Sequence, residues 1–114
     1  MPDCIFCKIA AGLIPSSKVY EDEHTLIFKD INPVAPTHLV AIPREHFPTI
    51  QDVPDQKSDV LKKLFEAVGK MVKQQNLSAN GYRLVINSGE QAGQLVPHLH
   101  AHILAGRALT WPPG

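Results

Sequence analysis

The chain has 114 residues, of which 44% are hydrophobic, and this is enough for one compact domain over residues 1–114. Lysine plus arginine and aspartate plus glutamate number 11 each, and the resulting net charge of zero argues against nucleic acid or an anionic membrane as a partner. No apolar stretch approaches the roughly 20 residues of a membrane span, and the start Met1-Pro2-Asp3-Cys4 lacks the basic and apolar regions of a signal peptide, so we expect a cytoplasmic protein.

Prolines divide the first half of the chain into short elements. In chain order, the patterns predict a short helix over Asp3–Ala11, a β-hairpin of Val19–Glu21 and Thr25–Lys29, a loop over Asp30–Pro36 and a strand over His38–Ile42. The helix ends at a glycine and the last strand at a proline, which are residues that commonly stop these elements.

The second half begins with the one long helix that the sequence predicts. Between Asp55 and Gln75 the apolar residues recur with a period of 3.6, as expected for a helix that packs one stripe on a sheet. They are Val60, Leu61, Leu64, Phe65, Val68, Met71 and Val72, and we assign the phenylalanine and the methionine to the core. A strand over Tyr82–Asn87 and a glycine-containing loop over Ser88–Pro97 follow. Together these elements predict an α+β fold with an antiparallel sheet of about five strands and helix cover.

The most informative segment is His98-Leu99-His100-Ala101-His102-Ile103-Leu104, which holds three of the six histidines at every second position. On a β-strand, alternate side chains point to opposite faces. The three imidazoles then share one face, and the apolar residues between them point into the core. Grouped imidazoles can act near neutral pH as nucleophile, proton carrier or metal ligand.

Two cysteines lie in the segment Cys4-Ile5-Phe6-Cys7. They are too few for a secreted disulfide scaffold, and in a reducing compartment such a pair more often has a metal or redox role. The two thiolates could share one zinc ion if two further ligands converge on them. Alternatively, both thiols simply pack within the N-terminal helix.

The chain resembles the histidine triad (HIT) superfamily in three segments: Pro36-Thr37-His38, Gly93-Gln94 and the alternating histidines. The ending Trp111-Pro112-Pro113-Gly114 and the start Cys4-Ile5-Phe6-Cys7-Lys8-Ile9 resemble its Hint branch of nucleotide-binding proteins. The resemblance covers essentially the whole chain. It implies a five-stranded antiparallel sheet with one long and one short helix. It also implies a homodimer in which the two sheets join and Trp111 lies near the partner's site.

The resemblance also implies an activity, the hydrolysis of purine nucleoside phosphoramidates through a covalent nucleotidyl-histidine intermediate. By position in the motif, His100 is the nucleophile, and its second ring nitrogen donates to the backbone carbonyl of His98. His102 would bind the phosphoryl oxygen or handle the leaving group, and His38 would complete the proton network. This mechanism requires no metal ion.

Nucleotide-binding residues carry over from the same resemblance. Asp30 matches the carboxylate that accepts both ribose hydroxyls. The walls around the base match Ile5, Phe6, Phe28, Ile31 and Val40, although each of these could equally be plain core. The phosphate side matches Asn87, Gly93 and Gln94. A structural zinc site, which some HIT relatives have, would consist of Cys4, Cys7, His46 and His98.

One position departs from the pattern. The residue after Gly93-Gln94 is usually serine or threonine in Hint proteins, and here it is Leu95. Leucine leaves only its backbone N–H as a donor to the phosphate. We therefore expect a slower hydrolase or an altered preference for the leaving group.

Two other classes of function fit the same motifs. One is another enzyme of the superfamily, either a dinucleoside polyphosphate hydrolase or a nucleotidyl transferase. The other is a non-catalytic module that binds nucleotides, zinc or a protein, since alternating histidines on a strand bind zinc in other folds.

Overall fold

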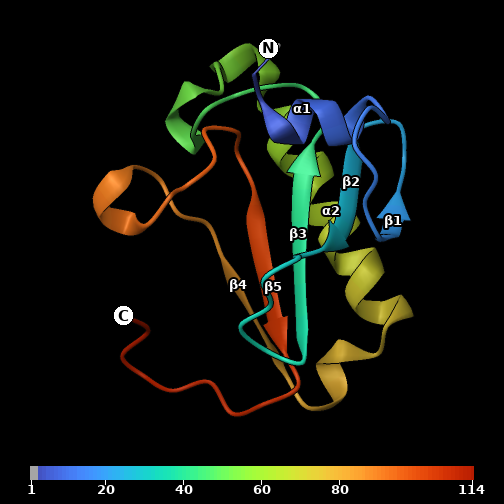
Figure 1. Cartoon of the computed structure of the whole chain (residues 1–114), viewed down its shortest axis with the longest axis vertical. Helices are drawn as coiled ribbons and strands as arrows, with labels where there is room; N and C mark the ends of the chain where they lie inside the picture. Colours follow the sequence, from blue (N-terminus) through green and yellow to red (C-terminus); the bar gives the residue numbers. More distant parts are fainter. Residues whose placement is uncertain (1–2) are drawn as a thin grey trace.

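The computed structural model describes residues 3–114, and Met1 and Pro2 of the predicted domain lie outside the described residues. Its centre is a five-stranded sheet with the order β1-β2-β3-β5-β4, in which every neighbouring pair is antiparallel (Figure 1). The strands are β1 (Lys18–Glu21), β2 (Thr25–Lys29), β3 (Thr37–Pro43), β4 (Tyr82–Val85) and β5 (Ala101–Ala105). The predicted α+β fold class is confirmed.

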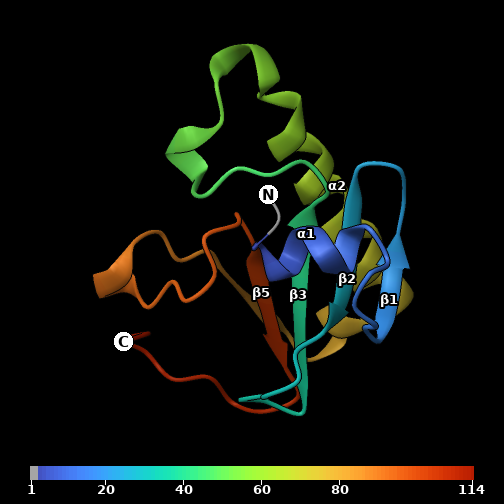
Figure 2. The same cartoon turned by 45° about the horizontal axis from the view of Figure 1, so that its top comes forward.

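One helix covers each face of the sheet. The long helix α2 (Asp59–Gln74) packs on one face and the short helix α1 (Ile5–Ala10) on the other (Figures 1 and 2). Short 3-10 turns lie at Ile50–Asp52, Asp55–Lys57, Leu77–Ala79 and Glu90–Ala92. Within residues 3–114, no helix has both the length and the apolar character needed to cross a membrane.

Side chains alternate along each strand between the two faces of the sheet, and this divides the core into two layers. The same alternation decides which residues of β3 and β5 point to each face. Leu39 and Ala41 of β3, with Ala101 and Ile103 of β5, face α2 and pack against its buried stripe. Val40 and Ile42 face α1 instead. By the same alternation, His38 and His102 point to the α1 side of the sheet.

Several predicted boundaries shift by a few residues. The first helix is shorter than Asp3–Ala11 at both ends, the long helix begins at Asp59 after a 3-10 turn, and β4 ends at Val85 rather than Asn87. The histidine strand begins at Ala101, so His98 and His100 lie just before it.

The assignment of Phe65 to the core is wrong. Its side chain is 47% exposed, whereas Met71 is fully buried as predicted. Phe65 falls at the edge of the apolar stripe, one residue after Leu64, which points straight at the sheet. Successive helical residues are about 100° apart, and the 100° step from Leu64 carries Phe65 to the outer side of the stripe.

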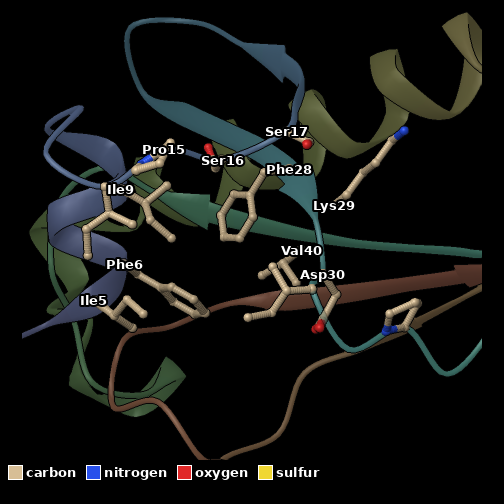
Figure 3. A pocket seen from close by; sticks show the side chains of 13 residues that line it. Ile5, Phe6, Ile9, Pro15, Ser16, Ser17, Phe28, Lys29, Asp30 and Val40 are labelled. Carbon is tan, nitrogen blue, oxygen red and sulfur yellow. The ribbon is translucent and has the colours of Figure 1, made fainter.

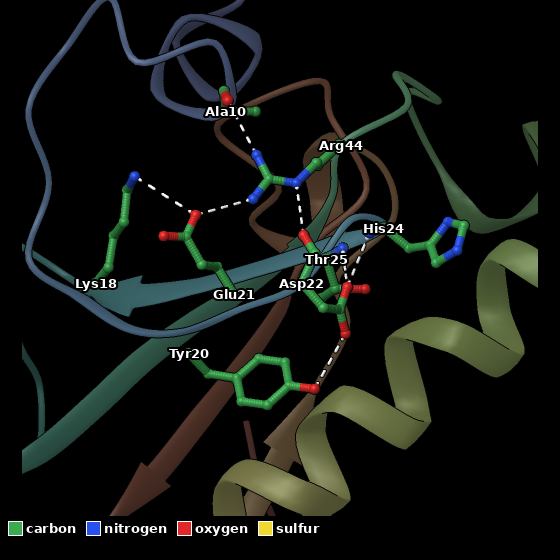
Figure 4. Close-up of polar contacts among 8 residues, drawn as sticks. All are labelled: Ala10, Lys18, Tyr20, Glu21, Asp22, His24, Thr25 and Arg44. Carbon is green, nitrogen blue, oxygen red and sulfur yellow. Dashed lines mark hydrogen bonds and ion pairs between the residues drawn. The ribbon is translucent and has the colours of Figure 1, made fainter.

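Arg44, just after β3, fixes α1 on the sheet. Its guanidinium donates to the Ala10 carbonyl at the end of α1 (3.1 Å), to the Asp22 carbonyl (2.9 Å) and to the Glu21 carboxylate (3.0 Å) (Figure 4). These bonds tie the helix to the β1–β2 turn. A six-residue helix is not stable by itself in water, so α1 depends on such tertiary contacts for its position.

Candidate active site

Three histidines come together on the α1 side of the sheet. The strand register pairs Val40 of β3 with His102 of β5, which brings His38 and His102 close to each other. Their ring centroids lie 5.1 Å apart, and the rings of His100 and His102 lie 4.9 Å apart. The three residues that the sequence nominates for catalysis therefore form one contiguous cluster.

His100 is held as a neutral ring with one free nitrogen. Its Nδ1–H donates to the His98 carbonyl at 2.6 Å, the acceptor that the resemblance implies. The side chain is only 5% exposed, and burial lowers its pKa below the usual 6.5, against the opposing effect of this hydrogen bond. With Nδ1 protonated, the lone pair of the neutral imidazole is on Nε2. His100 thus has the tautomer that a nitrogen nucleophile requires.

The hydrogen-bond network also fixes the protons on the other two rings. The backbone N–H of Val34 donates to Nδ1 of His38 at 3.1 Å, so a neutral His38 carries its proton on Nε2. That proton lies on the 2.9 Å contact with Nδ1 of His102. His102 then carries its own proton on Nε2, because its Nδ1 accepts. Burial, and repulsion from His100 and His38, lower the pKa of His102.

Asp30 completes this network at the end of β2. One carboxylate oxygen accepts the Asn32 backbone N–H at 2.8 Å, and the other lies 3.4 Å from Nε2 of His38. The ligand atoms of Asp30, His38 and His102 lie within 4.8 Å of one another. A metal ion on Nε2 of His38 would move that ring's proton to Nδ1, where it would face the Val34 N–H. We therefore interpret the three residues as a proton network.

An apolar cleft of about 730 Å³ opens beside the histidines, between α1 and β2 (Figure 3). This volume is in the range of small-molecule sites. Six predicted nucleotide-binding residues line it, namely Ile5, Phe6, Phe28, Asp30, Ile31 and Val40. Phe6 links the cleft to the histidine cluster, because its ring packs edge-on against that of His100 with centroids 5.1 Å apart.

The three residues predicted for the phosphate side and the neighbouring Leu95 do not line this cleft. Asn87, Gly93, Gln94 and Leu95 lie on the loop between β4 and β5. The Gln94 side chain organises that loop, since it accepts from the Gly89 N–H (2.9 Å) and donates to the carbonyls of Pro48 (2.7 Å) and Val96 (3.1 Å). The Leu95 side chain is 91% exposed.

The four predicted metal ligands form a second cluster. Nδ1 of His98 lies 3.3 Å from Sγ of Cys4, 3.5 Å from Sγ of Cys7 and 3.2 Å from Nδ1 of His46, and the last nitrogen lies 3.3 Å from Sγ of Cys7. A tetrahedral zinc ion, at about 2.1 Å from nitrogen and 2.3 Å from sulfur, separates its ligand atoms by roughly 3.3–3.8 Å. The donor atoms and their spacing fit zinc.

The groups around this cluster favour the binding of a metal ion by its side chains. Nε2–H of His98 donates to the Pro43 carbonyl at 2.8 Å, which leaves the Nδ1 lone pair directed at the two thiols. Burial lowers the pKa of His98 to about 4, so its imidazole is neutral at physiological pH. Burial and the neighbouring Cys4 raise the pKa of the Cys7 thiol, so a bound metal ion must displace its proton.

Some contributors to the site have no signal in the sequence. The Val34 N–H and the Pro43 carbonyl are backbone groups. Any residue could supply the carbonyl, and any residue except proline could supply the N–H. The cleft is also lined by Ser16, Ser17 and Lys29, for which only proximity to the hairpin could have been a guide.

Comparisons with known proteins identify the family of the chain. A family model described as scavenger mRNA decapping enzyme C-term binding matches residues 3–110. The chain is 44% identical over 104 residues to the protein HitA of Neisseria gonorrhoeae, covering 91% of this chain and 96% of that protein. A HIT-like protein of Azospirillum brasilense is 43% identical over 109 residues, with 95% and 89% covered.

Solved structures give the same result. A HIT family hydrolase from Legionella pneumophila is 49% identical, with a TM-score of 0.93 and coverage of 98% of this chain and 100% of that one. A histidine triad nucleotide-binding protein from Candida albicans is 36% identical, with a TM-score of 0.83 and coverage of 96% and 83%. The family match over residues 3–110 and these relatives together show the family. The chain belongs to the HIT family.

Proposed function

We propose that the protein hydrolyses the P–N bond of purine nucleoside phosphoramidates through a nucleotidyl intermediate on His100. The observation that carries this proposal is the fixed tautomer of His100, whose Nδ1–H is bound to the His98 carbonyl while Nε2 keeps its lone pair. A buried neutral imidazole with one free nitrogen, next to a cleft of suitable size, is suited to attack on phosphorus. The hydrolase named among the relatives supports the broader class of reaction.

The proton network supplies what the leaving amine needs. Nε2 of His100 bonds to phosphorus, and the P–N electron pair leaves with the amine, which takes the proton from Nε2 of His102. His38 can pass its Nε2 proton to Nδ1 of His102 across their 2.9 Å contact, and one proton taken up from solvent with the substrate restores neutral imidazoles in the network. The positive charge that His100 acquires equals the charge of that proton, so the step balances. Water then attacks phosphorus, returns a proton to the network and releases His100.

The cleft supports a nucleoside as the rest of the substrate. Phe6 and Phe28 lie edge to face with centroids 5.6 Å apart, and together with the aliphatic residues they form apolar walls for a base. Asp30 lies at the end of the cleft toward His38, where its carboxylate could accept ribose hydroxyls. A nucleoside bound in this way would direct its 5′ phosphate toward the histidines.

A substrate panel tests the proposal against its rivals. We expect an adenosine phosphoramidate to be turned over with a kcat/KM at least about tenfold higher than that of a diadenosine polyphosphate, or of nucleotidyl transfer to a second phosphate acceptor. A preference for either of the latter would identify another enzyme of the superfamily. Nucleotide binding without turnover of any of them would indicate a non-catalytic module.

Leu95 provides a prediction about rate. Replacing Leu95 with serine restores a side-chain donor at the position where Hint proteins have one, and the loss of a transition-state donor can cost on the order of 10² in rate. We expect Leu95→Ser to raise phosphoramidate turnover by about tenfold or more. Leu95→Ala is the matched control, because it removes the leucine without adding a hydroxyl. Equal turnover in the parent and Leu95→Ser would remove this explanation.

A structural zinc ion at the Cys4/Cys7/His46/His98 cluster is the second part of the proposal. Zinc bound there would supply a cross-link between α1, the residues after β3 and the residues before β5. Its four protein ligands would leave no open position, as in structural rather than catalytic zinc sites.

We also propose a homodimer, formed through the β4 edge of the sheet. β4 pairs only with β5 among the strands described, and Tyr82 on this strand and Phe65 on α2 are 42% and 47% exposed. An open strand edge with exposed aromatic residues nearby is suited to pairing with a second copy. Trp111, which is 81% exposed, is the residue expected to reach the partner's site.

Sedimentation at micromolar concentration tests the dimer. We expect twice the chain mass for the parent, and a shift toward monomer for Tyr82→Asp, because a charge within an apolar interface is costly to bury. Leu13→Asp, at an apolar position that is 75% exposed away from β4, is the control. A parent protein that sediments only as a monomer would contradict the dimer.

A further inference from the structure

The loop between β2 and β3 carries the groups that set the proton network, and it is held from outside the site. Two residues that follow β5 contact it. Nε of Arg107 donates to the Val34 carbonyl at 3.1 Å. Gly106, at a φ of +95°, approaches Pro36 so closely that a Cβ there would lie 2.8 Å from the proline Cβ.

These contacts make Val34 a junction with both of its backbone groups engaged. Its carbonyl accepts from Arg107, and its N–H donates to Nδ1 of His38. Nε2 of His38 in turn contacts Nδ1 of His102 at 2.9 Å. Hydrogen bonds to the two adjacent peptide units of Val34 therefore connect an exposed guanidinium to His38, whose Nε2 contacts the ring beside the nucleophile.

We propose that Arg107 is a positioning residue that selects the tautomers of His38 and His102 through Val34. This inference rests on the proposed function for its effect on catalysis, but its effect on the tautomers can be tested without any substrate. Arg107 itself touches none of the reacting atoms.

The physical reason is that either ring can be the hydrogen-bond donor in the contact between His38 and His102, depending on which nitrogen of each ring carries the proton. While the Val34 N–H faces Nδ1 of His38, that nitrogen must accept, so the proton sits on Nε2 and His102 is left with a proton on its own Nε2. If the peptide that carries the N–H turns away, His38 can place its proton on Nδ1. Its Nε2 then accepts from Nδ1 of His102, and His102 no longer has a donor on Nε2. One reoriented peptide thus removes the donor that the leaving amine requires.

Arg83 is a matched control for Arg107. Its guanidinium also donates to backbone carbonyls of the C-terminal segment, at 2.9 Å for Thr110 and 3.4 Å for Leu109. Neither of these residues is hydrogen-bonded to the histidine cluster. Arg83→Leu therefore removes a similar set of bonds without touching the loop that holds His38.

The test compares Arg107→Leu, Arg107→Lys and Arg83→Leu with the parent by ¹⁵N NMR of the histidine rings and by steady-state kinetics. In the parent, we expect the nitrogen shifts to assign the Nε2–H tautomer to His38 and to His102. In Arg107→Leu, both rings should become mixtures of tautomers. Phosphoramidate kcat should fall about tenfold, and KM should change less than twofold. This fall in kcat is at the low end of the effects expected for the loss of a hydrogen bond from a charged donor, because Arg107 is exposed. Arg107→Lys, which keeps a charged donor, should restore most of the parental tautomer preference and most of the parental kcat. Arg83→Leu should leave the nitrogen shifts of the histidine rings unchanged.

Unchanged tautomers in Arg107→Leu would overturn the proposal, whatever happens to the rate, since a loss of rate alone would indicate a merely structural role. Equal tautomer mixing in Arg83→Leu would also overturn it. If the parent shows the expected tautomers but no phosphoramidase activity, the proposed function fails while the assignment of Arg107 stands.

Discussion

Replacing His100 by alanine is expected to lower kcat for adenosine phosphoramidate hydrolysis by about 10⁴-fold or more, as losing a covalent nucleophile does in other hydrolases. The affinity for AMP should change by no more than about threefold, because the cleft that holds the nucleoside is lined by other residues. The reason for this separation is that His100 interacts with phosphorus only as the new bond forms. Rate should therefore be lost without binding.

The control for this variant is His24→Ala, which removes an exposed histidine side chain that lies outside both histidine clusters and 3.5 Å from the Glu23 carboxylate. Its activity should equal that of the parent. Melting temperatures of both variants, measured in parallel, exclude unfolding as the cause of a loss. If His100→Ala kept more than about a hundredth of the parental kcat, a covalent role for this residue would be untenable.

The second large effect is expected on removal of metal from the Cys4/Cys7/His46/His98 cluster. Protein purified without a histidine tag should contain about one zinc ion per chain by elemental analysis. Stripping this zinc with a chelator should lower the melting temperature by 10 °C or more. In a domain of this size, each 1 kcal/mol shifts the melting temperature by roughly 3–6 °C, and a structural zinc site contributes several kcal/mol.

The physical reason is that α1 is too short to be stable alone and depends on tertiary contacts for its position. This helix has six residues, and in the described chain its end is hydrogen-bonded to Arg44 while Cys4 caps its start by accepting the Cys7 N–H at 3.3 Å. A metal ion on both thiols would join α1 to His46 and His98. His46→Ala should reproduce the loss of zinc and of stability, and His24→Ala should not. Zinc-free protein that melts at the same temperature as the purified protein would contradict a structural site.

The sequence predicts much of the fold because its patterns are local. The long amphipathic stripe corresponds to α2, and the alternation of His100, Ala101, His102 and Ile103 places imidazoles and apolar side chains on opposite faces as expected. Proline and glycine mark most of the element ends within a few residues. Phe65 is an exception because a helical period tolerates a residue at the edge of the stripe, and only the position of the sheet decides whether it is covered.

The residue types of the site are predictable from the sequence, but the hydrogen bonds that fix the protons of its histidines are not. The sequence identifies His38, His100 and His102, yet their protons depend on backbone groups of Val34 and His98, for which no side-chain pattern exists. The start of β5 at Ala101 also follows from tertiary contacts. The His98 side chain faces the two cysteines and the Pro43 carbonyl, and its N–H bonds to Val96 rather than to a neighbouring strand.

Mass spectrometry of the protein quenched during turnover tests the central claim most directly. After incubation with an adenosine phosphoramidate, we expect an adenylyl group on a histidine, located by peptide fragmentation at His100. The adduct should be absent from His100→Ala and present in His24→Ala. An adduct on another residue, or turnover of the phosphoramidate with no adduct on His100 under conditions that trap histidine-linked nucleotides, would contradict the account.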